Sequence, residues 1–419
     1  MKPRCSARQG PAHHLTAALL TACAVLSGTP ELRAEEAVCG GWANGQQVAQ
    51  INDERLAESS GLAAGWQNPD VLWTHNDSGD SARLFALSTA PSDDAGDPDA
   101  SPILTELTLE GAENIDWEDM AIGPCSAGGA TACIYVADFG DNLKQRDEVV
   151  LYRFEEPDLG SPPAPELTLT DGITAQRFTY EGGPRDAEAL LVDPQSAAIF
   201  IIEKVEEASS QVFELAGAFE DDAPLEARPV ATLTLAENFS FGRMITAADV
   251  APDGRSFSLR TYTHLYTYCA PGGDLRQAFE SEPQRLLVNP GTIQGEALGY
   301  ARDGESIWLT SERLPAPLLR FSRAPADDAG DVPDAGDTPD PQDIDEDAGP
   351  GDPDDDHDAG GDDDPQDEPE ESRSQLSGGC SMLASAPSPG YVPEWIVGLL
   401  AVVGLRRALN RFATRTPLP

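Results

Sequence analysis

The chain is poor in basic residues and in histidine. It carries 27 Lys and Arg against 73 Asp and Glu, which gives a formal net charge of −46 at pH 7. Because nucleic-acid backbones require a basic protein face, this balance excludes nucleic-acid binding. Residues 36–323 contain only two histidines, His75 and His264, so a zinc site is not expected there. The acidity itself is typical of a protein that stays soluble outside the cell.

Helical periodicity is almost absent from residues 36–323. The apolar runs in this region are short and rich in β-branched and aromatic residues, as at Val71–Thr74, Ile134–Ala137 and Ile199–Ile202. Turn sequences such as Pro252-Asp253-Gly254 separate them. This pattern predicts one all-β domain over residues 36–323.

A sequence repeat that predicts two short strands recurs five times in this domain. Each copy begins with small and acidic residues, passes through a turn and ends in an apolar strand with a polar last residue. The copies span Glu58–Asp77, Asp116–Asp138, Asp186–Glu203, Ile245–Thr261 and Gln294–Glu312. Repeats of roughly 50 residues in an all-strand pattern are typical of the blades of a β-propeller. We predict five blades, with six blades or an open sandwich as alternatives.

The last repeat has no fourth strand of its own in the sequence that follows it. The segment Gln46–Ile51, which precedes the first repeat, can supply that strand. Such an exchange would close the ring and leave no strand edge open. We therefore predict a propeller closed by an N-terminal strand.

The first 34 residues are predicted to be a secretory signal peptide. Basic residues precede the apolar run Leu15–Leu26, and the sequence favours cleavage after Ala34. A competing interpretation treats Leu20-Thr21-Ala22-Cys23 as a lipobox and Cys23 as a lipidated N-terminus. Both interpretations predict export.

Residues 324–377 are predicted to form a disordered acidic linker. Residues 324–372 hold 22 Asp and Glu and no Lys or Arg, with Asp-Ala-Gly-Asp repeats and frequent proline. Like charges repel, and almost nothing apolar is present to be buried. The repeats lack the residue order of a calcium-binding loop, so specific calcium binding is not expected in the linker.

In residues 378–419, Gly379-Cys380 is followed by a Pro/Ser spacer, the apolar run Trp395–Leu405 and a basic end. This order of features resembles the Cys-containing sorting tags of Gram-negative surface proteins. These 11 apolar residues are short for a permanent span, which needs about 20 residues. The resemblance implies cleavage near Cys380, lipidation of the new end and anchoring at the outer membrane or cell surface. A plain membrane tail is the alternative.

Four of the seven cysteines fall in the folded region, an even number that suits an oxidising compartment. Cys125 and Cys133 flank a flexible loop in the second repeat, and we expect them to form a disulfide. Cys39 with Cys269 then follows by elimination.

Acidic residues recur at equivalent places in the repeats. In an antiparallel blade, the start of the first strand and the end of the second strand lie at the same rim, so these residues should converge on one channel mouth. A ring of carboxylates is costly unless cations, shared protons or arginine neutralise it. Carboxylate oxygens are hard ligands that suit Ca²⁺. The predicted metal ligands are Asp77, Asp80, Asp138, Asp141 and Glu312. The candidates for catalysis are Glu118, Glu188, Glu203 and Glu296, and those for ligand binding are Lys204, Arg243 and Arg260.

Two phrases, Glu188-Ala-Leu…Glu203 and Glu296-Ala-Leu-Gly-Tyr…Leu-Thr-Ser-Glu312, resemble the esterase-like, phytase-type propeller family. That resemblance implies an acidic face on which calcium ions bridge a phosphate ester. The fourth repeat departs from it, because Ala247-Ala248 and Arg260-Thr261 stand where the other repeats carry acids. This departure permits an anion pocket formed by Arg243 and Arg260.

The first functional hypothesis is an exported, surface-anchored binding or scaffold module whose rim recognises a ligand or partner, with Ca²⁺ as the cofactor. The second is a calcium-assisted phosphoesterase, and the third is a purely structural envelope protein. A Ser-His-Asp hydrolase is poorly supported, because Ser59 and Ser60 are not in a Gly-x-Ser-x-Gly sequence. We expect a monomer attached to the membrane through its C-terminal tag.

Overall fold

The computed structural model of the protein describes residues 41–90, 101–220, 223–288 and 294–324. The chain divides by its contacts into two units, residues 1–337 and 338–419, and every described residue belongs to the first unit. The predicted signal peptide with Ala34, the tag with Cys380 and all but the first residue of the acidic linker lie outside the described residues. In the part that is described, no helix combines the length and apolarity needed to cross a membrane.

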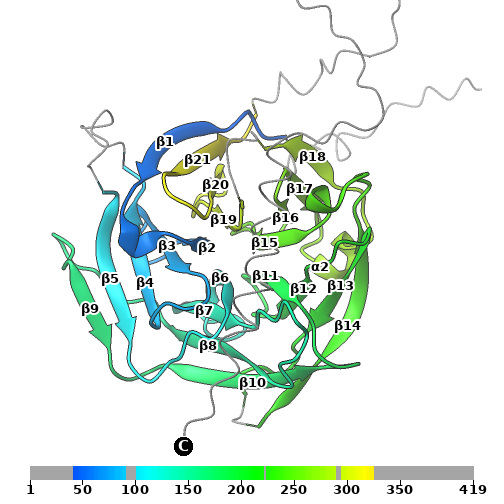
Figure 1. Cartoon of the computed structure of the whole chain (residues 1–419), viewed down its shortest axis with the longest axis horizontal. Helices are drawn as coiled ribbons and strands as arrows, with labels where there is room; N and C mark the ends of the chain where they lie inside the picture. Colours follow the sequence, from blue (N-terminus) through cyan, green and yellow to red (C-terminus); the bar gives the residue numbers. More distant parts are fainter. Residues whose placement is uncertain (1–40, 91–100, 221–222, 289–293, 325–419) are drawn as a thin grey trace, which may run out of the picture. The chain divides into compact units, whose positions relative to one another are not determined.

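The described strands form a β-propeller built from four-stranded antiparallel meanders (Figure 1). The first meander contains β2 (Ser59–Ala64), β3 (Val71–Asn76), β4 (Arg83–Ser88) and β5 (Ile103–Leu109). The second contains β6 (Trp117–Pro124), β7 (Ala132–Asp138), β8 (Val149–Glu155) and β10 (Thr174–Tyr180). The third contains β11 (Ala187–Val192), β12 (Ile199–Glu203), β13 (Ser209–Glu214) and β14 (Leu225–Thr234). The fourth contains β15 (Ile245–Val250), β16 (Ser256–Thr261), β17 (His264–Cys269) and β18 (Gln284–Leu287). The fifth contains β19 (Ala297–Tyr300), β20 (Ser306–Thr310) and β21 (Ala316–Ser322), and its fourth strand is β1 (Gln46–Ile51).

The N-terminal strand closes the ring. β1 pairs antiparallel with β21, from Gln46 opposite Arg320 to Ile51 opposite Ala316. The first strand of each meander also contacts the first strand of the next, from β2 through β6, β11, β15 and β19 back to β2. These five strands surround the centre of the ring in Figure 1. The prediction of an all-β propeller closed by an N-terminal strand is confirmed.

The outer edges contain features that the repeats do not show. The short strand β9 (Glu166–Leu169) pairs in parallel with β5, and β10 pairs in parallel with β14. Three short helical segments, η1 (Glu54–Leu56), η2 (Ser240–Gly242) and α2 (Leu275–Ala278), lie in connections between strands. The parallel pairings tie neighbouring blades together at the periphery, where each outer strand would otherwise have a free edge.

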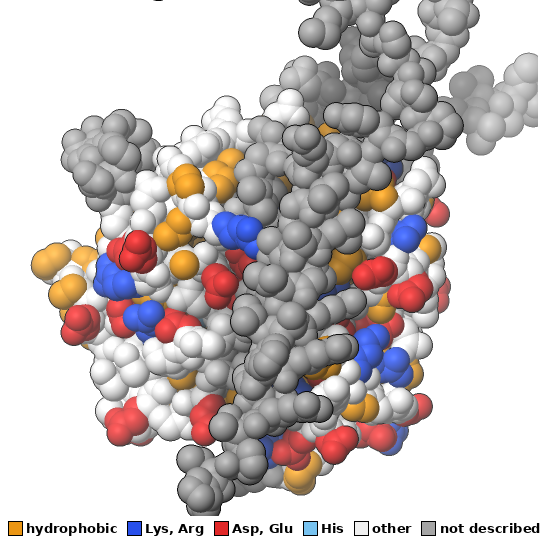
Figure 2. Space-filling model, in the orientation of Figure 1, with side chains coloured by type: hydrophobic (Ala, Val, Ile, Leu, Met, Phe, Trp, Pro, Cys, Tyr) orange, Lys and Arg blue, Asp and Glu red, His pale blue; other side chains and the backbone are white. Residues whose placement is uncertain are grey.

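Apolar side chains fill the space between the blades. Trp73 and Trp117 are both fully buried there, and the Trp117 ring meets the His75 ring edge-on at 5.4 Å between centroids. On the outside, acidic and basic side chains lie close to one another over the face seen in Figure 2. Cys125 and Cys133 form the predicted disulfide. Cys269 is also disulfide-bonded, and its predicted partner Cys39 lies outside the described residues.

Two buried aspartates link the backbones of different blades. Oδ2 of Asp119 on β6 accepts hydrogen bonds from the N–H of Leu190 (2.8 Å) and the N–H of Ala248 (3.1 Å), which belong to β11 and β15. Oδ2 of Asp249 on β15 accepts one from the N–H of Tyr300 on β19 (2.7 Å). These carboxyl groups hold the central strands together with hydrogen bonds that strand pairing cannot supply.

Asp249 should make stability depend on pH. Burial raises its pKa to about 7, although the N–H groups of Tyr300 and Val250 oppose the shift. The folded state therefore favours the neutral acid, and its contribution is complete below the unfolded pKa near 4 and is lost as the pH rises to about 7. The loss amounts to about 1.4 kcal/mol per pH unit in that window.

We expect Asp249→Asn to flatten the dependence of unfolding free energy on pH between about 4 and 7, as measured by urea unfolding. The slope is the readout, because a change in stability that is equal at every pH leaves the slope unaltered. Asp171→Asn, at an exposed bend, is the control and should leave the slope unchanged. An unchanged slope in Asp249→Asn would contradict the raised pKa.

Candidate functional site

A β-bulge interrupts the first strand of four blades at its second or third residue. The pairing with the second strand shifts between Trp117 and Asp119, between Ala187 and Ala189, and at the matching places in β2 and β15. A bulge places one extra residue outside the regular alternation of side chains and re-aims it. The extra residues in β6 and β11 are Glu118 and Glu188, and Glu296 holds the matching place just before β19.

The ends of the second strands meet the same rim. The backbone N–H groups of Asp77, Lys204 and Glu312 donate to Glu58, Asp186 and Gln294, the residues at the starts of the three first strands. The three side chains thus occupy one repeat position in blades one, three and five. Tyr262 follows the second strand of blade four in the same way, and its hydroxyl donates to Oε1 of Glu296 (3.0 Å).

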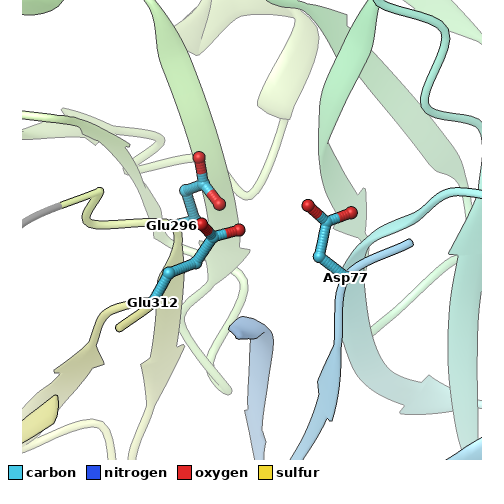
Figure 3. A group of neighbouring side chains, drawn as sticks. All are labelled: Asp77, Glu296 and Glu312. Carbon is cyan, nitrogen blue, oxygen red and sulfur yellow. The ribbon is translucent and has the colours of Figure 1, made fainter. Parts of the chain in front are cut away.

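Three carboxylates from blades one and five converge at the mouth of the channel. Asp77, Glu296 and Glu312 each place an oxygen within 4.8 Å of the others, and all three are buried. Figure 3 shows the two glutamates side by side with Asp77 facing them. A second group, Asp77, Asp116 and Glu118, shares Asp77 and also places one oxygen of each residue within 4.8 Å of the others. Oxygen atoms so arranged form a place for a hard divalent cation.

Burial and the carboxylate charges of this mouth raise the pKa values of neighbouring groups. Burial and the charge of Asp77 raise the pKa of Asp116 to about 7, and burial, Asp77 and Asp116 raise that of Glu118 well above its usual value. Burial and the charges of Glu296 and Glu312 raise the pKa of Tyr262 in the same way. A bound cation would reverse part of these shifts, because it favours the ionised carboxylates.

Gly140 allows Glu118 and Asp116 to approach the backbone closely. A Cβ atom at residue 140 would collide with Oε1 of Glu118 and would lie 2.7 Å from Oδ2 of Asp116. A glycine is therefore needed in the sequence Asp138-Phe139-Gly140 for both carboxylates to keep their places.

Lys204 is the basic group of the mouth. It is buried and forms an ion pair with Glu188. Burial alone would lower its pKa, yet the carboxylates of Asp186, Glu118, Glu296 and Asp77 hold that pKa above its ordinary value. Its neighbours come from blades one, two, three and five, so Lys204 marks the point on which the candidate acids converge.

Other predicted metal ligands hold the rim loops instead. Asp80 accepts hydrogen bonds from Asn76 (2.6 Å) and Arg83 (2.8 Å). Asp138 pairs with Arg146 (2.8 Å), whose N–H donates to Asp141 (2.6 Å). The structure does not place Asp80, Asp138 or Asp141 in either three-carboxylate group.

Glu203 and the two predicted anion-binding arginines also have structural contacts. Glu203 accepts a hydrogen bond from the N–H of Gln211 (3.0 Å) and lies 3.7 Å from Arg185. Arg243 donates to the carbonyl groups of Glu206 (2.7 Å) and Glu237 (3.0 Å).

Arg260 lies in the interior rather than beside Arg243. It is fully buried and donates to the carbonyl groups of Ala297 (2.6 Å) and Thr310. Burial lowers its pKa to about 9. The two guanidinium groups share no hydrogen-bond partner among the described contacts, so the structure does not bring them together as one anion pocket.

The weakly supported Ser-His-Asp set is not assembled either. The Ser59 hydroxyl is hydrogen-bonded with Thr74 (2.7 Å), and the Ser60 hydroxyl donates to the carbonyl of Glu118 (2.6 Å). His75 is fully buried, which lowers its pKa to about 4. Sequence reasoning missed Tyr262, although an alignment of the repeats on the residue after the second strand would have placed it beside Asp77, Lys204 and Glu312.

Comparisons with known proteins give one structural similarity and no relative. No family model matches the sequence, and no curated protein matches it closely enough to count as a relative. Among solved structures, the chain is similar to the crystal structure of RRP9 WD40 repeats, with 9% sequence identity and a TM-score of 0.34. The match covers 67% of this chain and 100% of that chain. At this level of similarity, the strand pairings described above remain the basis for the propeller fold.

Proposed function

We propose that this propeller is a binding module that holds Ca²⁺ at its channel mouth and recognises a ligand or partner at that face. The observation that carries the proposal is the convergence of Asp77, Glu296 and Glu312 from two blades that adjoin where the ring closes. Carboxylate oxygens are the ligands that calcium prefers, and calcium accepts irregular geometry. Waters or a ligand would complete its coordination.

The arrangement favours binding over catalysis. In the calcium-assisted phosphoesterase hypothesis, cationic side chains beside the metal would help it hold the phosphate. Arg243 donates to the carbonyl of Glu206, Arg260 is fully buried and donates to the carbonyl of Ala297, and Lys204 is paired with Glu188. The enzyme remains the second candidate because the Lys204 ammonium lies within the field of Asp77 and Glu296. Turnover of nitrophenyl phosphate that requires Ca²⁺ and is lost in Glu188→Ala would favour the enzyme.

Export and attachment at the cell surface belong to the same proposal. The disulfide between Cys125 and Cys133 supports an oxidising compartment. The predicted signal peptide and sorting tag supply the route and the anchor, so the channel mouth would meet ligands outside the cell.

The calcium site is tested by thermal unfolding of the full chain with excess Ca²⁺ and with a chelator. A ligand that binds only the folded state stabilises it by about 2.7 kcal/mol when its concentration is 100 times its dissociation constant. We therefore expect a higher melting temperature with excess Ca²⁺ than with the chelator. The double variant Asp77→Asn, Glu296→Gln should lose the response.

The matched control is Glu305→Gln, at an exposed turn, which should respond to Ca²⁺ like the unaltered chain. An equal rise in the double variant would place calcium elsewhere in this acidic chain. No rise in the unaltered chain would overturn the calcium-dependent function.

A further inference from the structure

Exposed apolar side chains gather at the end of the propeller that carries the acidic mouth. Among the described residues, five large apolar side chains are exposed, and four of them lie on this end: Ile115 (54%), Leu143 (41%), Phe239 (44%) and Leu287 (64%). Ile115 precedes the first strand of blade two, and Leu143 follows its second strand. Phe239 precedes the first strand of blade four, and Leu287 ends its last strand. The fifth, Val230 (41%), lies within the outer strand β14.

Ionic contacts lie near these four residues in the chain. The N–H of Ile115 donates to Asp138 (3.4 Å), which also pairs with Arg146 in the loop that carries Leu143. Near blade four, Glu237 pairs with Arg285 (2.7 Å) on β18, two residues before Leu287. Surfaces that are ordered before binding lose less entropy on binding, so this end is suited to hold a partner.

The centre of the same end is complementary to a cation. Asp77, Asp116 and Glu118 converge there, and Lys204, whose ammonium lies in the field of Glu118 and Glu296, is already paired with Glu188. The Tyr262 hydroxyl donates a hydrogen bond to Glu296, and the Tyr262 ring meets the Phe241 ring at 5.7 Å between centroids. Aromatic faces beside carboxylates attract ammonium and guanidinium groups.

We propose that this end docks a protein segment that presents a lysine or arginine flanked by apolar residues. The segment crosses from blade two to blade four, with apolar contacts to Ile115 and Leu143 on one side and to Phe239 and Leu287 on the other. Its cationic group enters the mouth at Asp116 and Glu118. The proposal rests on the binding function proposed above but does not require the metal ion.

The test is a selection from a random-peptide display library on the full chain, followed by fluorescence anisotropy on the enriched peptides as synthetic probes. We expect the enriched peptides to share a basic residue with apolar neighbours, and replacement of that residue by norleucine to abolish binding. Leu287→Ser, Ile115→Ser and Glu118→Gln should each weaken binding about tenfold or more, since burying a large apolar side chain or pairing a charge has effects of this size.

Val230→Ser is the matched control, because Val230 is as exposed as Leu143 (41%) but lies in the middle of the outer strand β14 rather than at the end with the mouth. No enrichment, enriched peptides without a basic residue, or equal weakening by Val230→Ser would each overturn the docking proposal. The calcium response of the same variants is a separate measurement. Peptide binding without a calcium response would support the docking proposal and overturn the calcium site. A calcium response without peptide binding would overturn the docking proposal alone.

Discussion

Asp119→Ala should unfold the propeller or lower its melting temperature by more than about 10 °C. The Asp119 carboxyl group is fully buried and accepts three backbone N–H groups, those of Met120 (2.9 Å), Leu190 (2.8 Å) and Ala248 (3.1 Å). Alanine would leave these donors buried without partners, at about 1–3 kcal/mol each. The sum approaches the whole stability of an ordinary domain, which is about 5–15 kcal/mol. A destabilisation of 1 kcal/mol lowers the melting temperature by about 2–4 °C in domains of this general size.

Asp119→Asn should fall between alanine and the unaltered chain. Burial raises the pKa of Asp119 well above its usual value, so the site favours a neutral group. The asparagine oxygen can still accept from Leu190 and Ala248, but its amide group would face the N–H of Met120, another donor. Circular dichroism melts of the full chain measure all three proteins, with exposed Asp171→Ala as the control. A melt of Asp119→Ala within a few degrees of the unaltered chain would show that these hydrogen bonds do not hold the blades together.

Much of the propeller follows from local patterns in the sequence. Each blade contains a hairpin whose turn residues are explicit, such as Pro252-Asp253-Gly254, and whose strands are continuous apolar runs. The closing strand Gln46–Ile51 could be inferred because the fifth repeat lacked a fourth strand, and β1 has these bounds in the structure. By contrast, β9 (Glu166–Leu169) alternates exposed and half-buried residues at the edge of blade one. Its parallel partner β5 lies far from it in sequence, so nothing local identifies the pairing.

Some of the acidic residues reach the mouth and others bind rim residues, and the difference depends on strand register, which the sequence repeats do not show. Asp138 and Glu203 are paired with residues of the first strand, Trp117 and Ala187. Asp77 comes one residue after Asn76, which is paired with Ser59. A shift of one residue turns a side chain to the opposite side of a strand. Asp138 therefore meets Arg146, whereas Asp77 reaches the mouth. The bulges at Glu118 and Glu188 add a second such shift, and neither is marked in the sequence by glycine or proline.

Lys204→Met should destabilise the protein by about 3–5 kcal/mol in the absence of divalent cations. Lys204 and Glu188 are both buried, and removal of one partner from a buried ion pair leaves the other charge uncompensated. Here the loss is compounded, because Lys204 also lies in the field of Asp186, Glu118, Glu296 and Asp77. Methionine keeps most of the volume of the side chain, so the change tests charge rather than packing.

Two further variants serve as comparisons for Lys204→Met. The double variant Lys204→Met, Glu188→Gln removes both charges of the pair and should recover part of the lost stability, which urea unfolding in a double-mutant cycle would measure. Arg177→Met, which breaks the exposed pair with Glu148, should change the stability little. Added Ca²⁺ should stabilise Lys204→Met more than the unaltered chain, since a cation at Asp77, Glu296 and Glu312 would replace part of the missing positive charge. If Lys204→Met is as stable as the unaltered chain with a chelator present, then the carboxylates around Lys204 do not give the mouth an uncompensated negative charge, and the calcium site loses its physical basis.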